Sequence, residues 1–113
     1  MARFSRGDIV ILSFPFSDAT GAKRRPALVL AELPFFGGMD YLVAMISSQK
    51  TSDPHSFEIL NSDITAGRLA VKSYLRPTYL FGAAGNGIDR RVAVMRPATL
   101  IRVVKAIVSV VDL

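Results

Sequence analysis

The chain contains no cysteine and no tryptophan, and it has a single histidine, His55. Without cysteine there is neither a disulfide framework nor a thiolate ligand for a metal, and a lone imidazole argues against a zinc site. A glycine-rich phosphate loop ending in Lys-Ser/Thr is also absent, as are closely spaced carboxylates. We therefore expect no metal and no cofactor. The sequence therefore lacks the residues and motifs needed for metal-dependent hydrolysis, for acyl transfer through a histidine-assisted serine and for nucleotide binding.

Long apolar runs are missing too. No run approaches the roughly 20 residues that span a bilayer, and charges at Arg3, Arg6 and Asp8 interrupt the first segment before a signal-peptide core could form. We expect no membrane contact and a cytoplasmic location. What is present is apolar and basic: half of the 113 residues are hydrophobic, and 14 Lys and Arg against 9 Asp and Glu give a net charge of +5. The apolar content predicts a homodimer, and the charge favours a partner that carries phosphate.

The apolar pattern predicts one domain, residues 1–113, of short strands followed by a helix. The expected strands cover residues 8–16, 26–31, 41–46, 56–60, 69–75 and 90–95. Segments 17–24 and 81–87 are expected as loops, and 61–66 as one helical turn. After Pro97, apolar residues recur at helical spacing from Leu100 to Val111, which predicts an amphipathic helix packed on the core. Together these elements predict a mainly β fold, a strongly bent antiparallel sheet or barrel with a C-terminal helix.

The candidate functional side chains stand where buried strands begin or end. Arg25 closes the basic segment 22–25 and precedes one buried strand, Ser47 follows the next, and Arg76 ends a third. If these strands are neighbours, two guanidinium groups and a hydroxyl would face one groove, an arrangement that suits phosphate. RNA cleavage needs none of the missing parts, because the 2′-hydroxyl of the substrate is itself the nucleophile. An arginine would then stabilise the charged transition state.

Several blocks of the sequence resemble the MazF/PemK toxins of bacterial toxin-antitoxin systems. They are Gly7-Asp8-Ile9-Val10, Arg24-Arg25-Pro26-Ala27-Leu28-Val29-Leu30, Ile46-Ser47-Ser48-Gln49, Ser73-Tyr74-Leu75-Arg76-Pro77, and the helix after Arg96-Pro97. The resemblance covers nearly the whole chain in order. It implies an SH3-like curled barrel of the CcdB/MazF type with a C-terminal helix. It also implies a homodimer, an acidic antitoxin partner, and metal-independent cleavage of single-stranded RNA to 2′,3′-cyclic phosphate and 5′-hydroxyl ends.

By position in these blocks, the resemblance implies that Arg25 and Ser47 are the catalytic residues. The side chains expected to contact RNA are Lys23, Arg24, Gln49, Ser73 and Arg76. Ser47 departs from the family, which has threonine there, and Ser73 stands where some members carry an acidic residue. No general base is therefore assigned.

Two other interpretations stay open from the residues alone. The first is a catalytically weak or inactive module on the same fold that binds RNA, DNA or a protein partner, which the serine at position 47 keeps open. It predicts salt-sensitive binding without turnover. The second is a dimeric adaptor whose positive charge is incidental, and it predicts no binding of RNA even at low salt.

Overall fold

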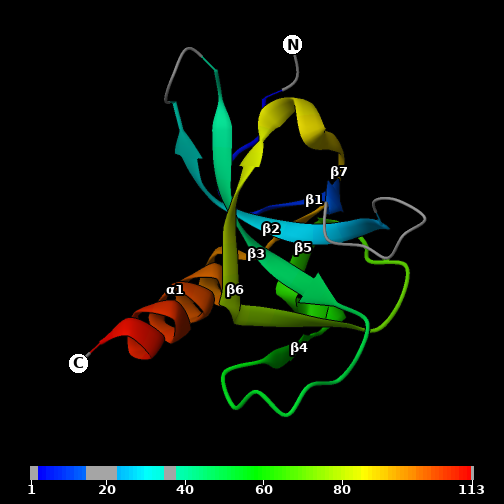
Figure 1. Cartoon of the computed structure of the whole chain (residues 1–113). Helices are drawn as coiled ribbons and strands as arrows, with labels where there is room; N and C mark the ends of the chain where they lie inside the picture. Colours follow the sequence, from blue (N-terminus) through cyan, green and yellow to red (C-terminus); the bar gives the residue numbers. More distant parts are fainter. Residues whose placement is uncertain (1–2, 15–22, 35–37, 113) are drawn as a thin grey trace.

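Seven strands, all paired antiparallel, form one sheet that curls into a half-barrel (Figure 1). The computed structural model describes residues 3–14, 23–34 and 38–112. The strands are β1 (Asp8–Phe14), β2 (Lys23–Leu33), β3 (Asp40–Ser47), β4 (Phe57–Ile59), β5 (Ile64–Gly67), β6 (Ser73–Ala84) and β7 (Ile88–Met95). Their order across the sheet is β4-β6-β3-β2-β1-β7-β5. With the single helix α1 (Pro97–Val111), this is the mainly β fold that the sequence predicts.

The two edge strands, β4 and β5, are consecutive in the chain and are joined through the short 3-10 helix η1 (Asn61–Asp63). The sheet therefore bends far enough to bring both edges to one connection. Register irregularities between Val29 and Ala31 in β2 and within the β3–β6 pair provide part of this curvature. Gly67 ends β5 at φ +71°, where a Cβ atom would lie 2.1 Å from the carbonyl oxygen of Val92. Only glycine fits this close approach.

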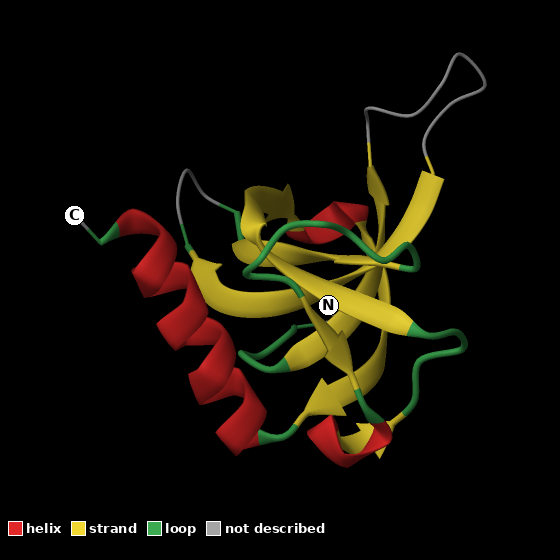
Figure 2. Cartoon of the chain, turned by 90° about the horizontal axis from the view of Figure 1, so that it is seen from below, coloured by secondary structure: helices red, strands yellow, loops and turns green. Residues whose placement is uncertain are grey.

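Apolar side chains are buried on both faces of the sheet. One cluster contains Val29 and Val43, and Phe4 closes it with its ring edge-on to Tyr41 at 5.7 Å between centroids. The second cluster lies on the opposite face and includes Val103 of α1, which runs along that side of the sheet (Figure 2). A further short 3-10 helix, η2 (Gly85–Gly87), links β6 to β7.

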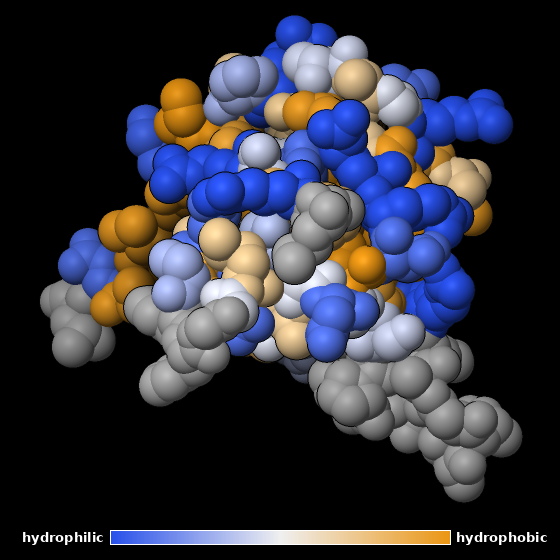
Figure 3. Space-filling model, turned by 90° about the horizontal axis from the view of Figure 1, so that it is seen from above, coloured by the Kyte–Doolittle hydropathy of each residue, from blue (hydrophilic) through white to orange (hydrophobic). Residues whose placement is uncertain are grey.

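Helix α1 begins where expected, with Pro97 in its first turn and the Leu100 N–H donating to the Arg96 carbonyl at 3.0 Å. The prediction that its whole apolar stripe is core is wrong. Val103 is fully buried, but Val104 is 41% and Val111 68% exposed. The apolar arc of the helix is wider than the strip that one face of the sheet covers. In Figure 3 this exposed apolar surface gathers toward the C-terminal end of α1, at the left of the view. Within the described residues, no helix is long and apolar enough to cross a membrane.

Four element predictions need correction. The strand expected over residues 69–75 starts only at Ser73, and it continues through Arg76, which was expected to end it. Of the loop expected over residues 17–24, Lys23 and Arg24 belong to β2, because they pair with the end of β1, and residues 17–22 lie outside the described part of the chain. Residues 81–84 continue β6, because they pair with the first half of β3 despite Gly82. The expected helical turn of 61–66 stops at Asp63, and a seventh strand, β5, follows it in place of the expected six. In the last three cases a neighbouring strand overrides the local preference of the residues.

The Gly7-Asp8 block has a structural role in the fold. Gly7 has φ +96°, its N–H donates to the Val29 carbonyl at 2.9 Å, and its own carbonyl accepts from Met95 at 2.8 Å. The buried Asp8 carboxylate accepts the Ser5 N–H at 2.9 Å. These bonds tie the start of β1 to the strands on both sides of it.

A buried carboxylate fixes the junction between η1 and α1. Asp63 accepts the Leu60 N–H at 2.8 Å and the Thr99 hydroxyl at 2.7 Å, and its carbonyl accepts the Arg96 N–H at 2.7 Å. The connection between the two sheet edges is thereby fastened to the first turn of the helix.

Candidate functional site

The pairing between strands β2 and β3 ends next to the predicted catalytic residues. Their ladder ends with Ala27 opposite Met45, and both chains run on, to Lys23 and to Ser47. Arg25 is two residues beyond Ala27, and Ser47 is two residues beyond Met45. Since side chains alternate along a strand, both belong to the face of Ala27 and Met45. The fold therefore brings Arg25 and Ser47 to one end and one face of the sheet.

Arg76 reaches the same face from β6. It pairs with Met45, and Tyr74, two residues before it, pairs with Ser47. Three strands that lie side by side thus contribute the three residues that the sequence singled out at strand ends. Strand β6 does not end at Arg76, but its register against β3 shifts there.

A cavity of about 350 Å³ opens at the point where β2 and β3 diverge. It is lined by Arg24, Arg25, Pro26, Ile46, Ser48, Val71 and Ser73. Two of these seven residues are arginines and none is acidic, so the cavity suits an anion with several oxygen acceptors. Among the residues that the structure describes, no three His, Asp or Glu side chains gather as a metal site would require.

The lining only partly coincides with the residues predicted from the sequence. Arg24, Arg25 and Ser73 line the cavity, whereas Ser47, Gln49 and Arg76 do not. Ser48 lines it and was missed by the sequence analysis. The alternation of side chains along β3 could have identified Ser48, because the residue after Ser47 must point to the other face of the sheet.

Ser47 is buried, with 8% of its surface exposed, and its hydroxyl oxygen accepts the Gln49 N–H at 3.0 Å. This bond closes a tight turn at the exit of β3 and fixes the hydroxyl in place. A serine hydroxyl has one proton to donate and a second lone pair, so it keeps the capacity to bind one further group. Gln49 itself is exposed.

The two arginines at the start of β2 differ in their partners. Arg24 is exposed and forms an ion pair with Asp89, which also binds Arg90. No carboxylate of the described residues pairs with Arg25, which is half-buried at the mouth of the cavity. A ligand can therefore bind Arg25 without displacing a carboxylate of the described residues. Lys23 starts β2, but its side chain lies outside the described part of the chain.

Ser73, the first residue of β6, also lines the cavity. It is 2% exposed, and its hydroxyl donates to the Val71 carbonyl at 2.8 Å. Its proton is thus engaged locally, while its oxygen can still accept a hydrogen bond from a ligand.

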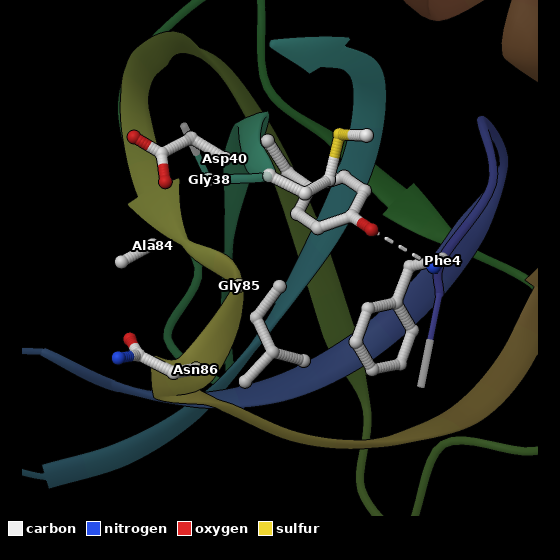
Figure 4. Close-up of a pocket in the computed structure, with 9 residues that line it drawn as sticks. Phe4, Gly38, Asp40, Ala84, Gly85 and Asn86 are labelled. Atoms are coloured by element: carbon white, nitrogen blue, oxygen red, sulfur yellow. Dashed lines mark hydrogen bonds between the residues drawn. The ribbon is translucent and has the colours of Figure 1, made fainter. Parts of the chain in front are cut away.

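A second cavity, of about 470 Å³, lies at the opposite end of the β2–β3 hairpin (Figure 4). Phe4, Met39 and Ile88 give it a largely apolar wall, and the Tyr41 hydroxyl accepts the Phe4 N–H at 3.1 Å. Its one charged lining residue is Asp40. An apolar cavity with a carboxylate at its edge suits phosphate less well than the cavity lined by Arg24 and Arg25 does.

Several solved structures share this fold. MazF from Deinococcus radiodurans superposes with a TM-score of 0.73 at 18% identity, with 100% of each chain covered. The Mycobacterium tuberculosis toxin MazF-mt6 gives a TM-score of 0.68 at 17% identity, over 94% of this chain and 97% of that one. A mycobacterial endoribonuclease in complex with its cognate antitoxin gives a TM-score of 0.72 at 14% identity, over 98% of this chain and 97% of that one. At these identities the likeness establishes the fold.

Sequence comparison gives the family. No curated protein matches this chain by sequence. The model of the family described as PemK-like, MazF-like toxin of type II toxin-antitoxin system matches residues 5–110, which is almost the whole chain and includes every block that carried the resemblance. The chain therefore belongs to the PemK-like, MazF-like toxins of type II toxin-antitoxin systems.

Proposed function

We propose that this protein is an endoribonuclease toxin that cleaves single-stranded RNA without a metal ion. The observation that carries the proposal is the position of Arg25, which stands unpaired by any described carboxylate at a cavity free of acidic residues. Membership of a toxin family supports it, as do neighbours of the same fold described as endoribonucleases.

The proposed chemistry uses the nucleophile of the substrate. The 2′-oxygen loses its proton and attacks the adjacent phosphorus, the bond from phosphorus to the 5′-oxygen breaks, and the leaving oxygen takes up a proton. The products are a 2′,3′-cyclic phosphate and a 5′-hydroxyl. Arg25 stabilises the extra negative charge on the phosphoryl oxygens through paired N–H donors, and it is too weak an acid to act mainly by proton transfer.

Ser47 has the role of orienting one phosphoryl oxygen by donating its free proton. We expect Lys23, Arg24, Gln49, Ser73 and Arg76 to bind the rest of the RNA, and two of them, Arg24 and Ser73, line the cavity together with Arg25. Arg25 pairs with Leu12 of β1 and Ser47 pairs with Tyr74 of β6, so both residues sit on paired strands, which favours a fixed geometry for the reacting phosphate.

The proposed partners are an acidic antitoxin and a second copy of the chain. The neighbour solved with its cognate antitoxin supports an antitoxin for this chain, and a net charge of +5 favours an acidic one. The exposed apolar stripe of α1, with Ile101, Val104 and Val108, supports a homodimer. Such a toxin acts on RNA in the cytoplasm.

The test is cleavage of a defined single-stranded RNA by the purified protein in excess EDTA. We expect cleavage to persist in EDTA and to fall about 10²- to 10³-fold in Arg25→Ala, the loss seen when one transition-state donor is removed. Arg25→Lys should recover only part of it, because an ammonium lacks the planar pair of donors. Arg3→Ala is the matched control, because it removes the same charge from an exposed pair with Glu32 at the far end of β2.

A non-catalytic RNA-binding module is the second candidate, favoured by one observation. The residue at the threonine position is a serine, and its hydroxyl already accepts a bond from Gln49. Salt-sensitive RNA binding with no turnover in EDTA or in added Mg²⁺ would establish this candidate in place of the first.

A further inference from the structure

Strand β6 contains a three-residue interruption beside the proposed site. Arg76 pairs with Met45 of β3, and the next β3 residue, Ala44, pairs with Leu80. Pro77, Thr78 and Tyr79 therefore have no partners on β3. A bulge of this kind re-aims the side chains that it contains, and bulges are frequent next to functional sites.

The side chains at this bulge form a stacked pair. The guanidinium carbon of Arg76 lies 3.9 Å from the centre of the Tyr79 ring, and the Arg76 Nε is buried without a hydrogen-bond partner. No carboxylate in the described part of the chain forms an ion pair with Arg76. Tyr79 is 48% exposed, so the residue is partly open to solvent. The guanidinium of Arg76 lies against its ring, and the charge of Arg76 also contributes to the lowered pKa of the Asp53 carboxyl without forming an ion pair with it.

The first two residues of the bulge are held in place. The Pro77 side chain is fully buried. The Thr78 hydroxyl donates to one carboxylate oxygen of Asp53 at 2.5 Å, and the His55 N–H donates to the other at 2.9 Å. The segment before β4 thus clamps the bulge from outside, and Tyr79 is presented by a fixed backbone rather than by a free loop. A ring held in this way loses little conformational entropy when it binds a ligand.

The pair lies on the same face of the sheet as the proposed catalytic residues. Tyr74 is opposite Ser47, and Arg76 is two residues further along β6, a distance of about 7 Å along a strand. A ligand that places a phosphate between Arg25 and Ser47 would extend past this pair if it runs along β6.

We propose that Tyr79 and Arg76 form a stacking platform for one unpaired base of the RNA, next to the phosphate held by Arg25. This inference rests on the proposed function, because it takes single-stranded RNA as the ligand. A base offers a flat π face to the ring and a phosphate to the guanidinium, which is how proteins hold single strands without reading much sequence. The platform fixes the strand, while Arg25 acts on the reacting phosphate.

The experiment measures binding of short 2′-O-methyl oligonucleotides, oligo(U) and oligo(A), which lack the nucleophile and cannot be cleaved. A chain of the same length with abasic sugars is the matched ligand. We expect Tyr79→Ala to weaken binding of both base-bearing chains by about 5- to 150-fold, the range for one stacked base, and to leave binding of the abasic chain unchanged. Tyr79→Phe should keep the wild-type affinity. Leu60→Ala, which trims a comparably exposed apolar side chain away from the site, should do the same.

If Tyr79→Ala does not fold, fluorescence of a second variant tests the same proposal. The chain has no tryptophan, so Tyr79→Trp introduces a single reporter. We expect its fluorescence to be quenched by base-bearing oligonucleotides and unchanged by the abasic chain. Equal effects of the base-bearing and abasic chains would overturn the platform.

The outcomes separate the platform from the ribonuclease. Weaker base-dependent binding in Tyr79→Ala, together with no cleavage of unmodified RNA by the wild type, keeps the platform and refutes the ribonuclease. Cleavage with unchanged KM and unchanged oligonucleotide affinity in Tyr79→Ala keeps the ribonuclease and refutes the platform. A Tyr79→Ala protein that binds RNA normally but escapes inhibition by an acidic protein partner would assign the ring to that partner instead, and would also overturn the proposal.

Discussion

The Ser47 hydroxyl accepts a 3.0 Å hydrogen bond from the Gln49 N–H at the end of β3, where β3 has already separated from β2. The bond holds the hydroxyl oxygen of a buried residue on the same face as Arg25, and it leaves the hydroxyl proton free. A threonine at this position would make the same bond with one fewer accessible rotamer.

From this relationship we expect Ser47→Thr to cleave RNA at least as fast as the wild type, because the added methyl restricts the hydroxyl. Ser47→Ala should lose about tenfold or more in kcat, since one charge-assisted hydrogen bond to the transition state disappears. Single-turnover cleavage of a labelled RNA measures both.

Ser48→Ala is the matched variant for this comparison, because Ser48 is exposed and lines the cavity from the other face of the strand. We expect it to raise KM more than it lowers kcat, as a residue that contacts bound RNA but not the reacting phosphate should. A larger loss of kcat in Ser48→Ala than in Ser47→Ala would reverse the assignment of the two hydroxyls.

The Asp63 carboxylate predicts a loss of stability without a specific loss of function. Asp63→Ala leaves the Leu60 N–H and the Thr99 hydroxyl without their acceptor in a buried position, so we expect unfolding free energy to fall by about 3 kcal/mol. Thr99→Val removes one of these bonds and should cost about 1 to 2 kcal/mol. Urea unfolding followed by circular dichroism measures both, and equal stabilities for the three proteins would exclude Asp63 as the fastening between η1 and α1.

The clamp at Asp53 predicts a pH dependence. The hydrogen bond from Thr78, with a smaller contribution from the His55 N–H, lowers the pKa of Asp53 below its usual range. A carboxyl whose pKa is lower in the folded state stabilises the fold above its unfolded pKa, and this contribution disappears as the pH falls through the folded pKa. We therefore expect the wild type to lose more thermal stability than Asp53→Asn as the pH falls from about 4 toward 2.

Thermal melts at a series of pH values measure this difference. Thr78→Val, which removes the largest cause of the pKa shift, should lose less stability on acidification than the wild type, as Asp53→Asn does. Parallel melting curves for the wild type and both variants across that pH range would contradict the clamp.

Much of the fold could be predicted from the sequence, because strong local patterns carry it. The apolar runs before Leu30 and before Ser47 are strands, and Pro97 starts the helix. The parts that were missed depend on partners distant in the chain. Arg24 is in a strand because it pairs with Ser13, and no feature of the local sequence shows this pairing.

In the candidate site, too, the residues marked by local patterns could be predicted and those that depend on strand pairing could not. Arg25 and Ser47 could be proposed from their places at strand ends, and the register then gives them a common face. Ser48 and Tyr79 were missed for a physical reason. The first enters the cavity only because β2 and β3 diverge, and the second stacks on Arg76 only because β6 bulges. Both events depend on strand pairing and not on residue type.

We propose that Arg25 assists attack by the 2′-hydroxyl of the RNA itself, and the chemistry of the fragment ends decides whether it does. Fragments are produced in EDTA from an RNA with a defined cleavage site, beside the same RNA carrying one 2′-deoxy sugar at that site, and are analysed by mass spectrometry. We expect 2′,3′-cyclic phosphate and 5′-hydroxyl ends, with the deoxy substrate left uncut. Fragments with 5′-phosphate ends, or cleavage at the deoxy position, would show that the 2′-hydroxyl is not the nucleophile.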